Sequence, residues 1–505
     1  MHQSETSAAN GPCRKPLYQT RSSLNALCGM AFQIPLASRY AFVVSPRQPL
    51  AEESGRQVKS SPSVKVQSTP ADAQRPLPAP TDTPAKPGGK SSSLSRSSVN
   101  SLRRLLPRIL VVVLLAAGFT LLFFQLDLMT KQHSEGLDFE AFYTAGRILN
   151  RGEPNRLYDV SLQQEIQREV GIAGPFMAYY HPPFEAPLFS PFALFSYAHA
   201  FLLWAAVNLA VLGLIIFLLI ATGYQLSSGL HFVWAAICLF FMLATLALGQ
   251  DTLLLVPIFM LAYFALKRRR EFIAGLVLGI GLFRLEVLLP FVFIFLLRRR
   301  WKLVAGFSVM GTIALVLSTA VVGTPGLAIY FKTLVSVGGA AGGSLADRTS
   351  AAMMPSLRGV MVALFGGVIP DRFMFPAVLL ATVFLLGWTA RYLRHLDNPT
   401  DRSFDLEFSL AVVAALLASY HVFVSELAPL ILVGFLVLAY ESRKPDHGVL
   451  ANRQGTALFS LFLCVVVGAA MVHSLDFSVE AVVLLGLMVW LSREIAAPED
   501  SFGSS

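Results

Sequence analysis

Charged residues and cysteines are both scarce in this chain. Asp, Glu, Lys and Arg make up 14% of the 505 residues, against roughly 25% in a soluble domain, while 54% are hydrophobic. The four cysteines are scattered without CxxC or other paired spacing, so the sequence predicts neither a disulfide framework nor a cysteine metal site. The apolar residues form runs of about 15 to 24, long enough to enter or cross a hydrocarbon core. We therefore predict an all-α polytopic membrane protein.

The net charge of +9 does not indicate a nucleic-acid partner, because the basic residues cluster at the ends of apolar runs. Such clusters stand at Arg103–Arg104, Lys267–Arg270 and Arg298–Arg300. Lys and Arg are enriched on the cytoplasmic side of membrane spans. This bias predicts that both termini are cytoplasmic.

Residues 1–100 are rich in Ser, Pro, Ala and Gln and lack periodicity, which predicts a disordered cytoplasmic tail. Residues 101–495 form the predicted membrane domain, followed by a short tail at 496–505. With the two short runs of the hairpin described below, the membrane domain has about twelve transmembrane helices. The other ten lie at about 108–126, 199–221, 231–248, 252–267, 303–322, 373–393, 406–420, 427–440, 456–473 and 478–492.

The first outer loop, 127–198, contains a segment with helical periodicity from Asp138 to Asn150. One face of this segment is apolar and comprises Phe139, Phe142, Tyr143, Gly146 and Leu149. With Glu140, Thr144 and Arg147 on the opposite face, the pattern predicts a helix lying in the membrane interface. Asp138 is either its N-cap or a general base within reach of an acceptor hydroxyl. Arg147 is either an interfacial residue with its charge toward water or a ligand.

A second piece of the same loop, 180–195, reads YHPPFEAPLFSPFALF. Its Pro pair stiffens the start of a helix, where Pro is tolerated. His181 and Glu185 either mark that start or belong to a site beside the membrane. Charge bias makes this piece interfacial or re-entrant rather than a full crossing.

Two short apolar runs, Phe272–Phe283 and Leu285–Leu297, have basic triplets at both outer ends. Helices of this length reach only about 18–20 Å, so the sequence predicts a hairpin that stops short of the far face. Arg284 at the junction then lies below the outer surface, where a charge needs a partner. It either pairs with Glu286 or another buried acid, or binds a lipid phosphate with its forked guanidinium.

The span at 303–322 leads into a predicted long outer loop, 323–372, which contains a short amphipathic piece, Ser356–Phe365. Under this topology several polar turns converge on the outer side. They are Asp138, His181, Gln250 with Asp251, Arg284, His421 and Glu426.

The motifs DFEAFYTAGR…LYD, HPPFEAPLFSPFALF, GQD and LFRLEVLLPFVFIFLLRRRW resemble those of glycosyltransferase family 87 over residues 108–440. This family is related to bacterial polyprenol-phosphate-mannose-dependent α-1,2-mannosyltransferases. The resemblance implies a GT-C-type fold in a bacterial inner membrane, with the active site facing outward. It also implies a polyprenyl-phosphate sugar donor, with mannose the first candidate hexose, a glycan or glycolipid acceptor, inversion at the anomeric carbon, and no required metal or cofactor.

On the same resemblance, Asp138 matches the catalytic aspartate of the family, and Arg284 matches a basic residue of the hairpin that contacts the donor phosphate. The family more often has Lys followed by Pro at the latter position, and Tyr where this chain has His181. His421 lies in a turn where the family carries a His and an acid, and we take it as a second phosphate ligand. Further candidate site residues are Tyr143, Arg147, His181, Glu185, Gln250, Asp251, Glu286 and Glu426.

Two other functions stay open at this stage. A secondary transporter also carries charged residues within its membrane domain, although we find no internal repeat with matched broken helices. A structural subunit without chemistry would tolerate neutral replacement of both Asp138 and Arg284.

Overall fold

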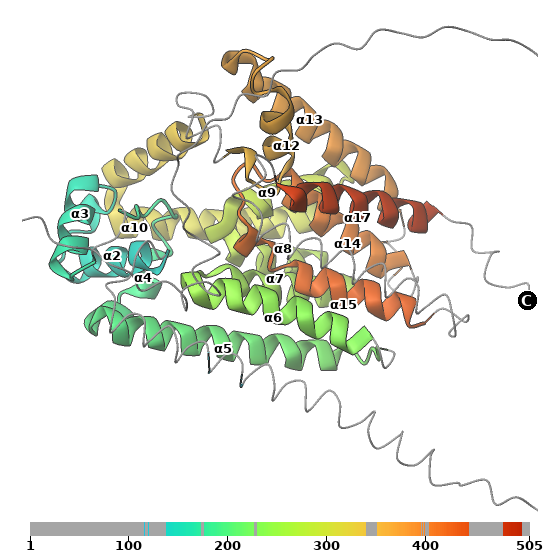
Figure 1. Cartoon of the computed structure of the whole chain (residues 1–505), viewed down its shortest axis with the longest axis horizontal. Coiled ribbons are helices and arrows are strands. Elements are labelled where there is room, and N and C mark those ends of the chain that lie inside the picture. Colours follow the sequence, from blue (N-terminus) through green and yellow to red (C-terminus); the bar gives the residue numbers. More distant parts are fainter. Residues whose placement is uncertain are drawn as a thin grey trace, which may run out of the picture. The chain divides into compact units, whose positions relative to one another are not determined.

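The computed structural model describes residues 116, 120, 138–172, 176–226, 230–339, 351–394, 396, 398, 403–443 and 478–496 (Figure 1). The predictions for the tails at 1–100 and 497–505, for the span at 456–473 and for nearly all of the span at 108–126 lie outside these residues. Every regular element in the described ranges is a helix.

The region before the first long helix consists of short elements. They are α2 (Phe139–Asn150), η2 (Pro154–Arg156), α3 (Val160–Glu169), α4 (Ala186–Phe189) and η3 (Phe192–Leu194). Because α4 and η3 have four and three residues, the piece around the Pro pair does not cross a membrane, as predicted.

Longer apolar helices follow. They are α5 (Tyr197–Ala221), α6 (Leu230–Leu248), η4 (Thr252–Leu254) with α7 (Leu255–Lys267), α8 (Glu271–Ile280), η5 (Gly281–Arg284), α9 (Leu285–Leu297), α10 (Trp301–Gly339), α12 (Leu357–Phe365), α13 (Asp371–Tyr392), α14 (Ser403–Ala418), η6 (Val424–Leu427), α15 (Leu430–Glu441) and α17 (Val479–Ala496). Most of these begin and end within three residues of the predicted spans, because long apolar runs bounded by polar turns leave little choice of register.

Five stretches of the described chain are long and apolar enough to cross a membrane. They are Tyr197–Ala221, Glu271–Leu297, Trp301–Val335, Arg372–Tyr392 and Val424–Glu441. The described residues thus support a multi-pass membrane protein, while the total of twelve spans stays a prediction.

The stretch Glu271–Leu297 is folded back on itself. Its first residue, Glu271, has its Oε1 atom 2.5 Å from Nη1 of Arg300, three residues beyond its last. A straight helix of this length would separate the two ends by about 40 Å. The chain therefore reverses at η5, which makes α8 and α9 the two arms of the predicted hairpin with Arg284 at its tip.

The predicted loop at 323–372 is partly helical, and the prediction is wrong at its start. Helix α10 bends at Gly323, whose φ of 70° and ψ of 173° are not helical, and then continues to Gly339. Pro325 does not end the helix, because Pro is tolerated in the first turn of the segment that restarts after the bend. Residues 340–350 lie outside the description, and α12 occupies the predicted amphipathic piece.

Helix α2 does not have the free polar face that the amphipathic pattern predicts, whereas its position at the membrane interface stays a prediction. It packs against α3, α4, η3 and α5, and both Glu140 and Thr144 of its polar face are fully buried. The Oγ1 atom of Thr144 donates to the Glu140 carbonyl and accepts from Nε2 of Gln167, at 2.6 and 3.3 Å. The described part of the predicted first outer loop is therefore a small folded layer around α2.

The centre of the helix bundle is α14, whose residues from Phe404 to Ala418 are all buried. Its Asp405 accepts from Tyr263 Oη of α7 at 2.5 Å and pairs with Lys267 of α7 at 2.9 Å. Asp405 also pairs with Arg443, just after α15, at 2.7 Å. This ionic cluster joins the helix ends that are predicted to be cytoplasmic. The length of α7, about 20 Å, separates the cluster from the turn that precedes η4.

Candidate functional site

Asp138 directs its carboxylate away from its own helix. It stands at the N-cap position of α2, but its backbone is helical and its side chain makes no capping hydrogen bond. Instead, the carboxylate accepts a hydrogen bond from Nε2 of Gln250. Burial raises the pKa of Asp138, and the hydrogen bond from Gln250 and the charge of Arg284 oppose this effect in part. The interpretation of Asp138 as a plain N-cap is therefore wrong.

The GQD turn brings Gln250 against α2 because its first residue is glycine. Gly249 has a φ of 68°, a backbone conformation that is unfavourable for residues with a Cβ atom. A Cβ atom there would lie 2.6 Å from Cβ of Phe139 and 2.9 Å from the ring of Phe201. The Gly249 carbonyl accepts from the Trp204 indole at 2.8 Å, which fixes the turn.

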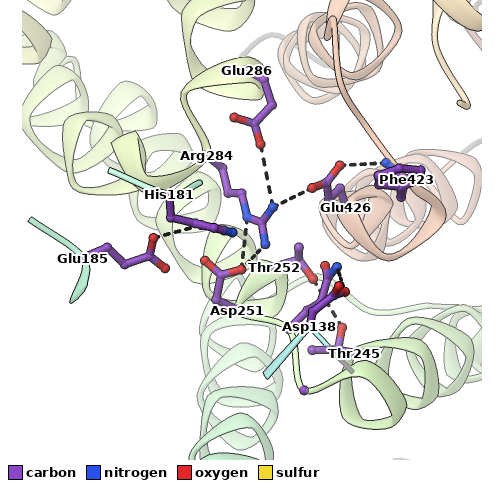
Figure 2. Close-up of polar contacts among 12 residues, drawn as sticks. Asp138, His181, Glu185, Thr245, Asp251, Thr252, Arg284, Glu286, Phe423 and Glu426 are labelled. Carbon is purple, nitrogen blue, oxygen red and sulfur yellow. Dashed lines mark hydrogen bonds and ion pairs between the residues drawn. The ribbon is translucent and has the colours of Figure 1, made fainter. Parts of the chain in front are cut away.

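Arg284 contacts several acidic residues of the site. Its Nε donates to Asp251 Oδ1 at 3.0 Å, its Nη2 donates to the same oxygen, and its Nη1 donates to Glu426 Oε1 at 2.5 Å. Glu286, the acid nearest in sequence, lies 3.8 Å from Nη1. The residue is 5% exposed. Arg284 thus forms the predicted pair with buried acids, chiefly two acids that are distant in sequence (Figure 2).

His181 and Glu185 lie on the other side of Asp251. The His181 ring packs edge-on to Phe142, with ring centres 4.7 Å apart, and stacks on Tyr179 at 5.6 Å. Its Nδ1 lies 2.9 Å from Glu185 Oε2 without hydrogen-bond alignment. Burial, followed by the charge of Arg284, lowers the pKa of His181 to about 4, so the imidazole is neutral at pH 7.

One ligand atom each of His181, Glu185 and Asp251 lies within 4.8 Å of the others, a donor set that suits a metal ion. Burial and the nearby Asp251 carboxylate raise the pKa of Glu185 well above its ordinary value. Burial, the largest single influence, would raise the pKa of Asp251, but the charges of Arg284 and His181 and the hydrogen bonds to Arg284 and Glu185 together lower it.

His421 lies near this group on the turn before η6. Its ring packs edge-on to Phe423, with centres 5.0 Å apart, and its residue keeps an exposed surface. Desolvation by its surroundings, and then the charges of Arg358 and Arg284, lower the pKa of His421 to about 4. Both guanidinium groups are therefore close enough to act on this imidazole.

Arg358 of α12 was absent from the predicted site. Its Nη1 donates to the Tyr420 carbonyl at 3.1 Å, and its guanidinium carbon lies 4.1 Å from the centre of the Tyr420 ring. Arg358 is 6% exposed, and among the described residues no carboxylate forms an ion pair with it. The available signal was a lone Arg in the amphipathic piece of the predicted outer loop.

Tyr143 and Arg147 make other contacts. The Tyr143 hydroxyl donates to the Phe195 carbonyl at 2.8 Å, and Arg147 Nη1 donates to the Ala193 carbonyl at 3.4 Å. Both bonds tie α2 to the η3 region rather than to Arg284. We therefore leave these two residues out of the site proposed below.

The family model for Glycosyltransferase family 87 matches residues 179–419 of the chain. The match includes His181, Glu185, the GQD turn, Arg284 and Arg358, and it stops short of Asp138, His421 and Glu426. No curated protein and no solved structure matches the chain significantly. The resemblance read from the sequence motifs is thus confirmed over the matched residues.

Proposed function

We propose that the chain, whose residues 179–419 match family 87, is a membrane glycosyltransferase that transfers a hexose from a polyprenyl-phosphate sugar to a hydroxyl acceptor. Mannose is the first candidate sugar, and the acceptor is a glycan or glycolipid. The reaction takes place at the outer face of a bacterial inner membrane, with both chain termini in the cytoplasm. A lipid-linked donor provides activated sugar on a face where cytosolic nucleotide sugars are absent.

The step is a single displacement with inversion. The acceptor oxygen bonds to the anomeric carbon while its proton passes to the Asp138 carboxylate. The bond from the anomeric carbon to the phosphate oxygen breaks, and its electron pair leaves with the polyprenyl phosphate. The step needs one base and a positive group that receives the growing phosphate charge.

The observation that carries this proposal is the orientation of the Asp138 carboxylate. The carboxylate points away from its helix toward Gln250. The residue that follows Gln250 in the chain, Asp251, pairs with Arg284. This places an acid with a raised pKa and a guanidinium in one cluster, although they come from α2 and from the hairpin tip. A base with a raised pKa transfers protons more effectively near neutral pH.

Two guanidinium groups are candidates for the donor phosphate. Arg284 is held by Asp251 and Glu426, so it contributes a fixed positive field and has few donors left. Arg358 has no carboxylate partner among the described residues, and with His421 it offers donors that a phosphate is able to use. We therefore propose that Arg358 and His421 contact the phosphate directly, while Arg284 stabilises its charge.

The test is transfer of radiolabelled sugar from a polyprenyl-phosphate donor by the purified full chain in detergent. We expect Asp138→Asn to lower turnover by about 100-fold or more, the range that a general base contributes. Asp159→Asn is the matched control, because Asp159 caps α3 in the same loop and Asn also caps helices. Wild-type turnover by Asp138→Asn would remove Asp138 as the base. Absence of any product with the wild-type chain would favour the transporter, which performs no chemistry in detergent.

A further inference from the structure

The candidate site contains more carboxyl groups than basic side chains. Five carboxyl groups surround the Arg284 guanidinium, those of Asp138, Glu185, Asp251, Glu286 and Glu426. Burying a charge without a partner is costly, so such groups bind protons, basic residues or metal ions. Arg284 accounts for Asp251 Oδ1 and for Glu426, which leaves Glu185, among the described residues, without an ion pair to Lys or Arg.

Two buried carboxylates present unused oxygens on that side. Glu185 is 4% exposed, and neither of its side-chain oxygens accepts a hydrogen bond from the described residues. Asp251 is fully buried, and its Oδ2 also lacks a donor, whereas its Oδ1 is held by Arg284. Figure 2 shows the carboxyl groups of Glu185 and Asp251 next to one another beside the His181 ring.

The imidazole nitrogen completes the arrangement. Nδ1 of His181 is buried, lacks a hydrogen bond, and lies 2.9 Å from Glu185 Oε2. Phe142 and Tyr179 hold the ring in this position. One ligand atom each of His181, Glu185 and Asp251 lies within 4.8 Å of the others, and each of the three residues has a side-chain atom without a hydrogen bond.

We propose that His181, Glu185 and Asp251 bind a divalent transition-metal ion. Ligands about 2.1 Å from such an ion lie at most about 4.2 Å apart, so small side-chain rotations complete the site. One imidazole with two carboxylates suits Zn²⁺ or Mn²⁺, whereas an all-oxygen set would suit Mg²⁺ or Ca²⁺. Asp251 then bridges the ion and Arg284, one oxygen to each.

This proposal departs from the family resemblance, which implies no required metal. It concerns binding and does not depend on the transfer reaction proposed above. The alternative to a metal ion is a proton shared by the Glu185 and Asp251 carboxyls. The experiment below distinguishes the metal ion from the proton.

The experiment uses the purified full chain, stripped with EDTA and freed of chelator. We expect Mn²⁺ and Zn²⁺, each added alone at up to about 1 mM, to raise the Tm by several degrees, and Mg²⁺ to raise the Tm by less. Electron paramagnetic resonance of added Mn²⁺ then reports about one bound ion per chain. Glu185→Gln and His181→Gln should each weaken Mn²⁺ binding by more than about tenfold.

Glu480→Gln is the matched control, because Glu480 is equally buried but lies in α17 and accepts from Ser478. It should keep the wild-type response to Mn²⁺. Glu185→Gln also distinguishes the proton, since the amide resembles a protonated carboxyl and would leave stability unchanged. The proposal is overturned if the wild-type chain shows neither a Tm shift nor bound Mn²⁺, or if both ligand variants bind as the wild type does.

Discussion

The Asp138 carboxylate accepts a hydrogen bond from Gln250, a residue 112 positions later in the chain. The bond joins the start of α2 to the turn between α6 and η4. Asp251, the next residue, pairs with Arg284 at the tip of the hairpin. A single turn therefore connects the proposed base to the positive centre of the site, and the predictions below follow from that connection.

Gln250→Ala should move the acid limb of the pH profile of kcat to higher pH. The Gln250 bond lowers the pKa of Asp138 against burial, which raises it, so removing the bond raises the pKa further. A general base works when deprotonated, and activity is lost as pH falls through its pKa. With the bond gone, that loss begins at a higher pH.

The measurement is kcat against pH for Gln250→Ala and for Gln164→Ala, an exposed residue of α3. The charges that act on Asp138 are those of Arg284, His181 and Asp251, and both variants leave them in place. An acid limb that shifts equally in the two variants, or in neither, would contradict the role of Gln250.

The main effect of Arg284→Ala should be a loss of protein stability, and its effect on the affinity for the lipid donor should be smaller. The substitution leaves Asp251 and Glu426 buried without their positive partner. Breaking a buried pair by removing one member costs about 3–5 kcal/mol. Thermal unfolding in detergent measures this loss, and Arg299→Ala in the exposed turn after α9 is the control. An unchanged Tm for Arg284→Ala would show that these two acids hold protons instead.

The hairpin tip illustrates what the sequence reveals and what it leaves out. The reversal at Arg284 follows from two apolar runs that are too short to cross and have basic triplets at both outer ends. The partners of Arg284 do not follow, because Asp251 and Glu426 are 33 and 142 residues away. Local spacing favours Glu286, which the structure places farther from the guanidinium.

Two other differences have local causes. Gly323 and Pro325 are typical of a loop, but the positive φ of one and the helix-starting geometry of the other allow α10 to bend and resume. The amphipathic pattern of α2 predicts a surface helix, yet its Glu140 and Thr144 are buried, and Gln167 of α3 donates to Thr144. Periodicity indicates which residues share a face, and it does not indicate what lies against that face.

Arg358→Ala should raise the KM for the lipid donor by about 10-fold or more with a smaller effect on kcat. Its guanidinium lacks a carboxylate partner among the described residues and acts on His421. Hydrogen bonds to charged groups contribute about 1.5–3 kcal/mol, which corresponds to roughly 10- to 100-fold in affinity. Arg372→Ala, at an exposed Arg early in α13, is the control. Equal KM values in both variants would exclude Arg358 as a phosphate ligand.

Gly249→Ala should separate the GQD turn from α2 and lower both activity and stability. The new Cβ meets Phe139 Cβ at 2.6 Å, and the φ of 68° is unfavourable for alanine by roughly 1–2 kcal/mol. Gly152→Ala is the matched control, because Gly152 has a φ of 75° but nothing within 4 Å of the added Cβ. The backbone penalty is thus common to both variants, and only Gly249→Ala adds the steric displacement of Gln250 from Asp138. We expect both to lower the Tm, with the larger drop in Gly249→Ala, and only Gly249→Ala to lose sugar transfer at a temperature where both are folded. Equal transfer by the two variants would mean that the close approach of this turn to α2 is not needed to orient Asp138.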